Sequence, residues 1–89
     1  MTTRFRLGKL IATPGALEAA PSREALMKLV QRHASGDWGD LDPQDKAENE
    51  LSLREGFRIL SAYELEGTRY WIITEADRSA TTILLPEEY

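Results

Sequence analysis

His33 is the residue whose chemistry would matter most, because it is the only histidine in the chain. Asp37 follows it after a short turn, and a histidine beside a carboxylate can act as a general base or acid. Arg78, within the run 74–79, carries a guanidinium that suits an anionic group, although the same run is also typical of a polar hairpin turn. His33 itself falls on the apolar face of a predicted helix, where a hydrogen-bonded structural histidine is expected. We therefore predict no catalytic site and keep His33, Asp37 and Arg78 as the residues of an enzymatic alternative.

The segment after this histidine is strongly acidic. Residues 37–50 contain six acids and one base, a local net charge of −5, so the rest of the chain is close to neutral within the total of −4. Nucleic-acid binding needs a basic footprint, and we expect no direct binding of nucleic acid, whereas an acidic surface suits a basic protein partner. The predicted partner-binding residues are Asp37, Trp38, Asp40, Asp42, Asp45 and Glu48.

Trp38 lies between two glycines, Gly36 and Gly39, with Asp37 beside it, and this pattern has two interpretations. Tryptophan is enriched at interface hot spots, and glycines let a partner approach the backbone closely. The alternative is that Trp38 folds back and caps the core between the helices. The sequence leaves both interpretations open.

Metal and cofactor chemistry finds little support. The chain has no cysteine, which excludes a disulfide scaffold and a thiolate zinc site. Asp37, Asp40 and Asp42 match a calcium loop poorly, because Gly39 and Leu41 occupy its third and fifth positions. There is no glycine-rich phosphate loop and no serine-hydrolase elbow. We expect no metal and no cofactor.

Eighty-nine residues, 42% apolar and 29% charged, predict one globular domain over residues 1–89. No apolar run approaches the ~20 residues of a membrane span, and the N-terminus has no apolar segment of signal-peptide type. We expect a cytoplasmic protein without membrane contact.

Hydrophobic periodicity and capping residues place the elements. Alternation over residues 4–13 predicts a strand, and residues 16–20 allow one loose helical turn. Ser22 is a good N-cap for a helix to about Ala34, while Asp42 and Pro43 begin a second helix that Gly56 ends. Three further strands are predicted at 57–65, 69–74 and 80–85. The predicted fold is α+β, with an antiparallel sheet of about four strands in the order β-α-α-β-β-β and two helices packed on one face.

Several runs together resemble a family of small proteins carried on bacterial plasmids, integrative elements and phages. These runs are Arg-His-Ala-Ser-Gly-Asp-Trp-Gly-Asp-Leu (32–41), Thr-Glu-Ala-Asp-Arg-Ser-Ala-Thr-Thr (74–82) and Leu-Leu-Pro-Glu-Glu-Tyr (84–89). The resemblance covers nearly the whole chain. Members bear labels such as plasmid-related protein, or labels borrowed from neighbouring restriction–modification genes, and the family has no settled activity. The resemblance implies a mobile-element context, in which small acidic proteins without enzymatic motifs are often anti-restriction or anti-CRISPR inhibitors; that step is analogy.

Three functional hypotheses follow. The leading one is a non-enzymatic binding protein whose acidic segment contacts a larger protein or nucleoprotein complex with a basic surface, the aspartates standing in for phosphates if that surface holds nucleic acid. The second is the small enzyme using His33, Asp37 and Arg78, which requires a pocket that joins the acidic loop to the turn at 75–79. The third is a homodimer built through an exposed sheet edge, with a regulatory role.

Overall fold

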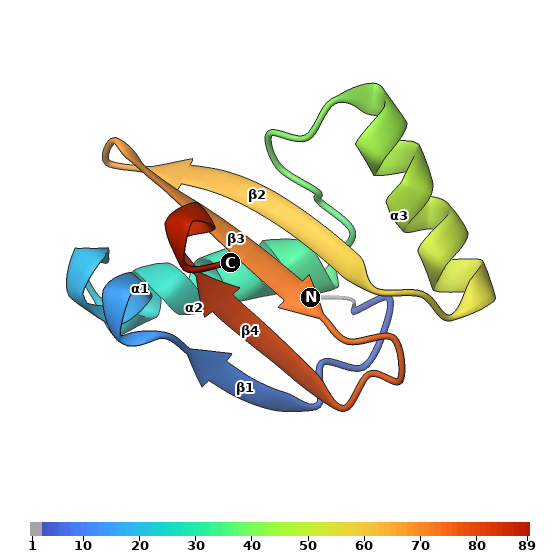
Figure 1. Cartoon of the computed structure of the whole chain (residues 1–89), viewed down its shortest axis with the longest axis horizontal. Coiled ribbons are helices and arrows are strands. Elements are labelled where there is room, and N and C mark those ends of the chain that lie inside the picture. Colours follow the sequence, from blue (N-terminus) through green and yellow to red (C-terminus); the bar gives the residue numbers. More distant parts are fainter. Residues whose placement is uncertain (1–2) are drawn as a thin grey trace.

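The computed structural model describes residues 3–89 and confirms the α+β class. Its elements are β1 (Lys9–Ala12), α1 (Pro14–Ala19), α2 (Arg23–Ala34), α3 (Pro43–Glu55), β2 (Ile59–Leu65), β3 (Thr68–Thr74), β4 (Ala80–Leu84) and a short 3₁₀ helix, η1 (Pro86–Glu88) (Figure 1). No helix in this described part of the chain combines the length and the apolar character that crossing a bilayer requires.

The sheet is mixed, so the predicted all-antiparallel sheet is wrong at its first strand. The strand order is β1-β4-β3-β2; β2, β3 and β4 form the predicted antiparallel meander, whereas β1 pairs parallel to β4. A parallel pair needs a crossover of a dozen or more residues, and the three helices and two strands between β1 and β4 supply it. Side-chain alternation predicts which face a residue occupies and contains no information on strand direction.

Local capping explains where the helices begin and end. The Ser22 hydroxyl accepts a hydrogen bond from the Ala25 amide at 3.0 Å, and the Asp42 carboxylate accepts one from the Asp45 amide at 2.8 Å. Gly56 ends α3 in the left-handed conformation, with φ of 78°. These predicted boundaries are confirmed. The loose turn expected near residues 16–20 is instead the six-residue helix α1.

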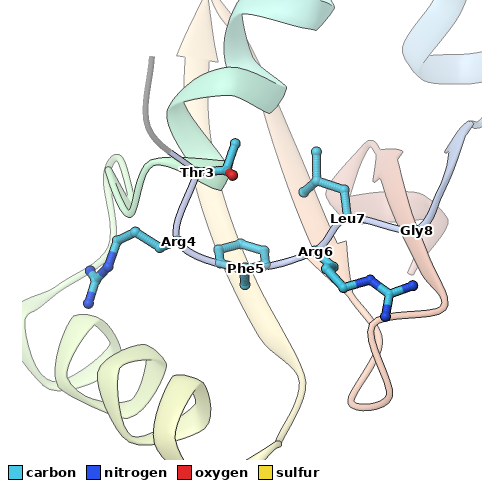
Figure 2. Close-up of a pocket in the computed structure, with 6 residues that line it drawn as sticks. All are labelled: Thr3, Arg4, Phe5, Arg6, Leu7 and Gly8. Atoms are coloured by element: carbon cyan, nitrogen blue, oxygen red, sulfur yellow. The ribbon is translucent and has the colours of Figure 1, made fainter.

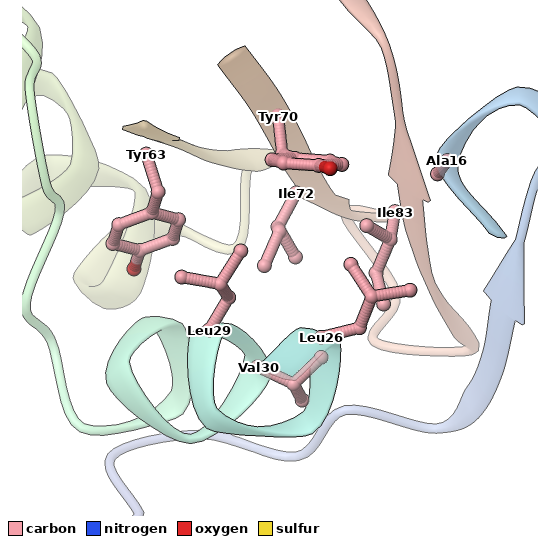
Figure 3. Packing of buried hydrophobic residues seen from close by; sticks show 8 residues of the cluster. All are labelled: Ala16, Leu26, Leu29, Val30, Tyr63, Tyr70, Ile72 and Ile83. Atoms are coloured by element: carbon pink, nitrogen blue, oxygen red, sulfur yellow. The ribbon is translucent and has the colours of Figure 1, made fainter. Parts of the chain in front are cut away.

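The core lies between α2 and one face of the sheet (Figure 3). The predicted helix face of Leu26, Leu29 and Val30 meets side chains that alternate along the strands; the buried cluster is Ala16, Leu26, Leu29, Val30, Tyr63, Tyr70, Ile72 and Ile83. His33 continues the same helix face by one turn and is also buried.

α3 does not share that face, and the prediction of two helices on one side of the sheet is wrong. It lies beyond the edge strand β2, and it contributes no residue to the core cluster (Figure 1). The buried residues of α3 are polar, Asn49 and Ser52, while Leu51 is 42% exposed. A helix without a continuous apolar stripe gains little by covering a sheet, so polar contacts decide its position.

The first strand is shorter than the predicted range 4–13. Residues 3–8 form an N-terminal segment that crosses the end of α2, where the Arg4 amide donates to the Ala34 carbonyl at 2.7 Å. Gly8 has φ of 66°, and a side chain there would clash with the carbonyls of Arg78 and Ser79. The close approach at Gly8 is what lets the segment turn into β1.

Candidate functional site

His33 is fully buried and hydrogen-bonded through both ring nitrogens. Nδ1 lies 2.5 Å from the Ser61 hydroxyl on β2, and Nε2 lies 2.9 Å from the Thr74 hydroxyl on β3. Phe5 of the N-terminal segment packs edge-on against the ring, with the centroids 5.2 Å apart. These contacts match the structural interpretation of this histidine.

The hydrogen bonds around His33 form a chain that ends at the Leu7 carbonyl, and because a carbonyl can only accept, this end sets the direction of every bond in the chain. The Thr81 hydroxyl donates to the Leu7 carbonyl at 2.7 Å, so its oxygen accepts from Thr74, 2.7 Å away. The Thr74 oxygen then accepts from His33 Nε2–H, which leaves Nδ1 to accept from Ser61. This chain of hydrogen bonds fixes the neutral tautomer of His33 that carries its hydrogen on Nε2, and every hydroxyl in it donates one hydrogen bond.

Burial lowers the pKa of His33 to about 3. The imidazole is therefore neutral near pH 7, and no carboxylate contacts either nitrogen in the described chain. A general base needs reach to a substrate and an orienting partner; this ring has neither solvent access nor an acidic neighbour.

Asp37 is bound to Arg32 instead of His33. Its Oδ2 accepts from Arg32 Nε at 2.7 Å, its Oδ1 accepts from the Gly39 amide at 3.2 Å, and its backbone carbonyl accepts from the Tyr63 hydroxyl. The Arg32 hydrogen bond holds the pKa of Asp37 below its usual range. Asp37 thus shapes the start of the acidic loop. The Tyr63 hydroxyl that bonds to it stays protonated, because burial raises the pKa of Tyr63 to about 12.

Arg78 binds backbone carbonyls. Its Nη1 donates to Phe57 at 2.7 Å and to Glu75 and Ala76 at 3.1 Å, and its Nη2 donates to the carbonyl of Ser52 at 3.0 Å. The guanidinium therefore ties the β3–β4 turn to the end of α3. Within residues 3–89, His33, Asp37 and Arg78 bond to separate partners, and none of them lines the described cavities, so the enzymatic alternative stays a prediction.

Trp38 is 4% exposed, so its ring lies in the core, as the second interpretation predicts. Its ring stacks on Phe5, with centroids 6.2 Å apart, and lies edge-on to His33. The indole Nε1 donates to Glu50 at 3.0 Å. With its ring covered by Phe5, Trp38 presents little surface to a partner, and its contact role stays a prediction.

The remaining predicted residues Asp40, Asp42, Asp45 and Glu48 are exposed, and none of them has an ion-pair partner within residues 3–89. Asp42 also caps α3. Asp45 and Glu48 line a cavity of about 150 Å³ between α3 and β2, together with Asn49, Ser52 and Arg58. The acidic surface, which we define as these four carboxylates, therefore follows the loop and the first turns of α3.

Sequence reasoning missed the residues that hold this surface in place. Asn49 donates to the Leu60 carbonyl at 2.6 Å and accepts from the Leu60 amide at 3.1 Å. Glu50 accepts two hydrogen bonds from Arg4, at 2.8 and 2.9 Å. The hydrogen bonds from Arg4 and Trp38 lower the pKa of Glu50 to about 2. An asparagine at an inward-facing helix position was the available signal.

The loop before α3 pairs with the free edge of β2. The Ala62 amide donates to the Trp38 carbonyl at 3.3 Å, and the Asp40 amide donates to the Ala62 carbonyl at 2.7 Å. Gly39 sits opposite Ala62 in this bridge, with φ of 74°. The bridge fixes the backbone from which the acidic side chains extend.

The N-terminal segment completes the support (Figure 2). Thr3–Gly8 line a wide, open depression of about 610 Å³ in the surface, and the side chains of Arg4 and Arg6 point to opposite sides of it. Arg4 forms an ion pair with Glu50. Within residues 3–89, no group of three or more histidine or acidic side chains could hold a metal ion.

Comparison with protein-family models, with curated protein sequences and with solved structures finds no match to this chain.

Proposed function

We propose that this protein is a non-enzymatic binding module that presents its acidic surface to the basic surface of a larger protein or nucleoprotein complex. The observation that carries the proposal is the contrast among the six acids of residues 37–50. Asp37 and Glu50 form ion pairs with Arg32 and Arg4, whereas the four carboxylates of the acidic surface form no ion pair with any residue of 3–89.

The position of α3 supports this proposal. The helix is anchored by its buried polar residues and by Glu50, all on the side that faces β2 and the N-terminal segment. The side chains of Asp40, Asp45 and Glu48 make no hydrogen bond to any other residue in 3–89, and Asp45 bonds to the cap Asp42 only through its backbone amide. Like charges gathered on the loop and the first turns of α3 suit electrostatic steering of a cationic partner, which raises the association rate at low salt.

The resemblance to mobile-element proteins suggests the class of partner. In that context we propose an inhibitor of a host defence complex, of the anti-restriction or anti-CRISPR kind, whose carboxylates occupy sites that hold nucleic-acid phosphates. An occupied site of that type would exclude nucleic acid by competition. This step depends on analogy and on the charge of the surface.

Charge reversal tests the proposal. The triple variant Asp40→Lys, Asp45→Lys, Glu48→Lys spares the cap Asp42, and we expect its capture of partners from host lysate to fall at least about tenfold at low salt. The matched control is Glu18→Lys, Glu66→Lys, Glu87→Lys, which changes net charge equally at exposed sites elsewhere. The readout is a tagged pull-down, with partners identified by mass spectrometry at about 50 mM and about 500 mM salt.

The two triple variants separate a specific contact from a general charge effect. Loss of the partner in the first variant alone supports the acidic surface as the contact. Equal loss in both, or retention in both, contradicts it. Circular dichroism of each variant checks that the fold is retained, which we expect because none of the reversed side chains is buried.

A further inference from the structure

β1 leaves one edge of the sheet open. The amides of Lys9 and Thr13 donate inward, to the Ser79 and Ile83 carbonyls at 3.0 Å. Backbone groups alternate along a strand, so the amides and carbonyls of Leu10 and Ala12 point outward. In Figure 1, no segment of residues 3–89 lies outside β1. The opposite edge differs, because Gly39 and Asn49 cover β2.

Apolar side chains surround this open edge. Leu10, Ile11, Leu17 and Met27 are each between 41% and 46% exposed. All four of them, together with Leu26 and Ile83, line an apolar groove of about 210 Å³ between β1 and the first helices. An unpaired strand next to exposed apolar side chains is a template for pairing with another strand.

We propose that β1 pairs antiparallel with β1 of a second copy of this chain, about a two-fold axis at Ile11. In this register Leu10 lies opposite Ala12 of the second copy, and each of these pairs exchanges two backbone hydrogen bonds. The two Ile11 side chains meet at the axis. The contact is isologous, so the same residues are covered on both copies.

Charge complementarity favours a second copy over an unrelated peptide. The same register places Lys9 opposite Thr13 of the second copy, whose hydroxyl donates to Glu88 at 2.5 Å. Lys9 is exposed and has no ion-pair partner within the described residues. The Lys9 ammonium therefore comes beside a Glu88 carboxylate, twice in each dimer. This interface is independent of the acidic surface, which lies at the other edge of the sheet.

A four-residue strand pair is a small interface, so the dimer is expected to be weak, with Kd on the order of 10–100 µM. Sedimentation equilibrium over a range of concentrations on both sides of this value gives the oligomeric state. Amide hydrogen exchange by NMR gives the register: the Leu10 and Ala12 amides should become protected as concentration rises, while Ile11 is protected throughout. A monomer at every concentration, or a dimer without this alternation, would overturn the proposal.

Matched variants locate the interface. Ile11→Lys puts two like charges at the axis and should weaken dimerisation at least tenfold, whereas Leu51→Lys, at an equally exposed position on α3, should not. Lys9→Glu should also weaken the dimer, and Lys9→Glu with Glu88→Lys should restore it. A dimer that survives Ile11→Lys unchanged contradicts the β1 interface, whatever other surface joins the copies.

Discussion

His33 makes stability depend on pH in a direction that follows from its pKa. The folded value is about 3 and the ordinary value is 6.5. Between these values the unfolded chain binds a proton that the folded protein does not, so acid favours unfolding. The stabilisation is complete above about pH 6.5 and is lost as the pH falls towards 3.

Replacing His33 should remove that dependence. We expect the wild type to lose about 2 kcal/mol of unfolding free energy between about pH 7 and pH 5, because each pKa unit is worth about 1.4 kcal/mol. His33→Gln can still donate to Thr74 and accept from Ser61. It should cost about 1–3 kcal/mol at neutral pH and flatten the slope.

Urea unfolding at a series of pH values measures both quantities. Since His33 is the only histidine, no other side chain has an ordinary pKa in this range. An unchanged slope in His33→Gln would show that another group is responsible.

Gly39 and Gly67 allow backbone strain to be separated from steric clash. Both have positive φ, 74° and 82°, so alanine is strained by about 1–2 kcal/mol at either position. A side chain at Gly39 would also meet the Ala62 carbonyl and the Tyr63 ring, whereas Gly67 has open space around it. Gly39→Ala should therefore cost about 1–3 kcal/mol more than Gly67→Ala in chemical denaturation. Equal losses would mean that the bridge to Ala62 yields easily.

At the scale of elements, Asn49 decides where α3 sits. Asn49→Ala leaves the Leu60 amide and carbonyl without their partners, and we expect a loss of about 2–3 kcal/mol. Gln44→Ala, at an exposed position of the same helix, is the control and should change stability by less than about 0.5 kcal/mol. Denaturation gives the energies and exchange of the Leu60 amide gives the location. If Leu60 stays protected in Asn49→Ala, another group holds the helix.

The elements also show what the sequence could predict. The predicted ends of the helices α2 and α3 agree with the structure, because the capping residues Ser22, Asp42 and Gly56 act on backbone groups near them in the chain. The direction of β1 and the place of α3 depend on partners far away in sequence, such as Leu60 for Asn49. Periodicity carries no such information.

The candidate site divides in the same way. Charge is visible in the sequence, and the acids from Asp40 to Glu48 are exposed as a charged segment should be. Whether a given residue is already paired depends on the fold. Arg4 and Glu50 are 46 residues apart, and the tryptophan that looked accessible between glycines is covered by Phe5.

At the scale of the whole molecule, the two edges of the sheet have different properties. The acidic surface and α3 lie beyond β2, and the open apolar edge is β1. Dimerisation through β1 would therefore leave both acidic surfaces at the far ends of the joined sheet. Two separated contact surfaces on one particle can bind two basic sites at once, which raises apparent affinity when their spacing matches.

The central place of β4 has a consequence for how the protein is made. β4 follows β1 by about seventy residues of chain and lies between β1 and β3, so β1 has no strand to pair with until β4 has been synthesised. On the ribosome, the helices and the β2–β3 hairpin emerge first, while Leu10 and Ile11 wait unpaired. A nascent chain halted before Ala80 would leave both edges of β1 and one edge of β3 unpaired. We expect proteases and chaperones to bind such a chain, because unpaired strand edges mark an incompletely folded protein.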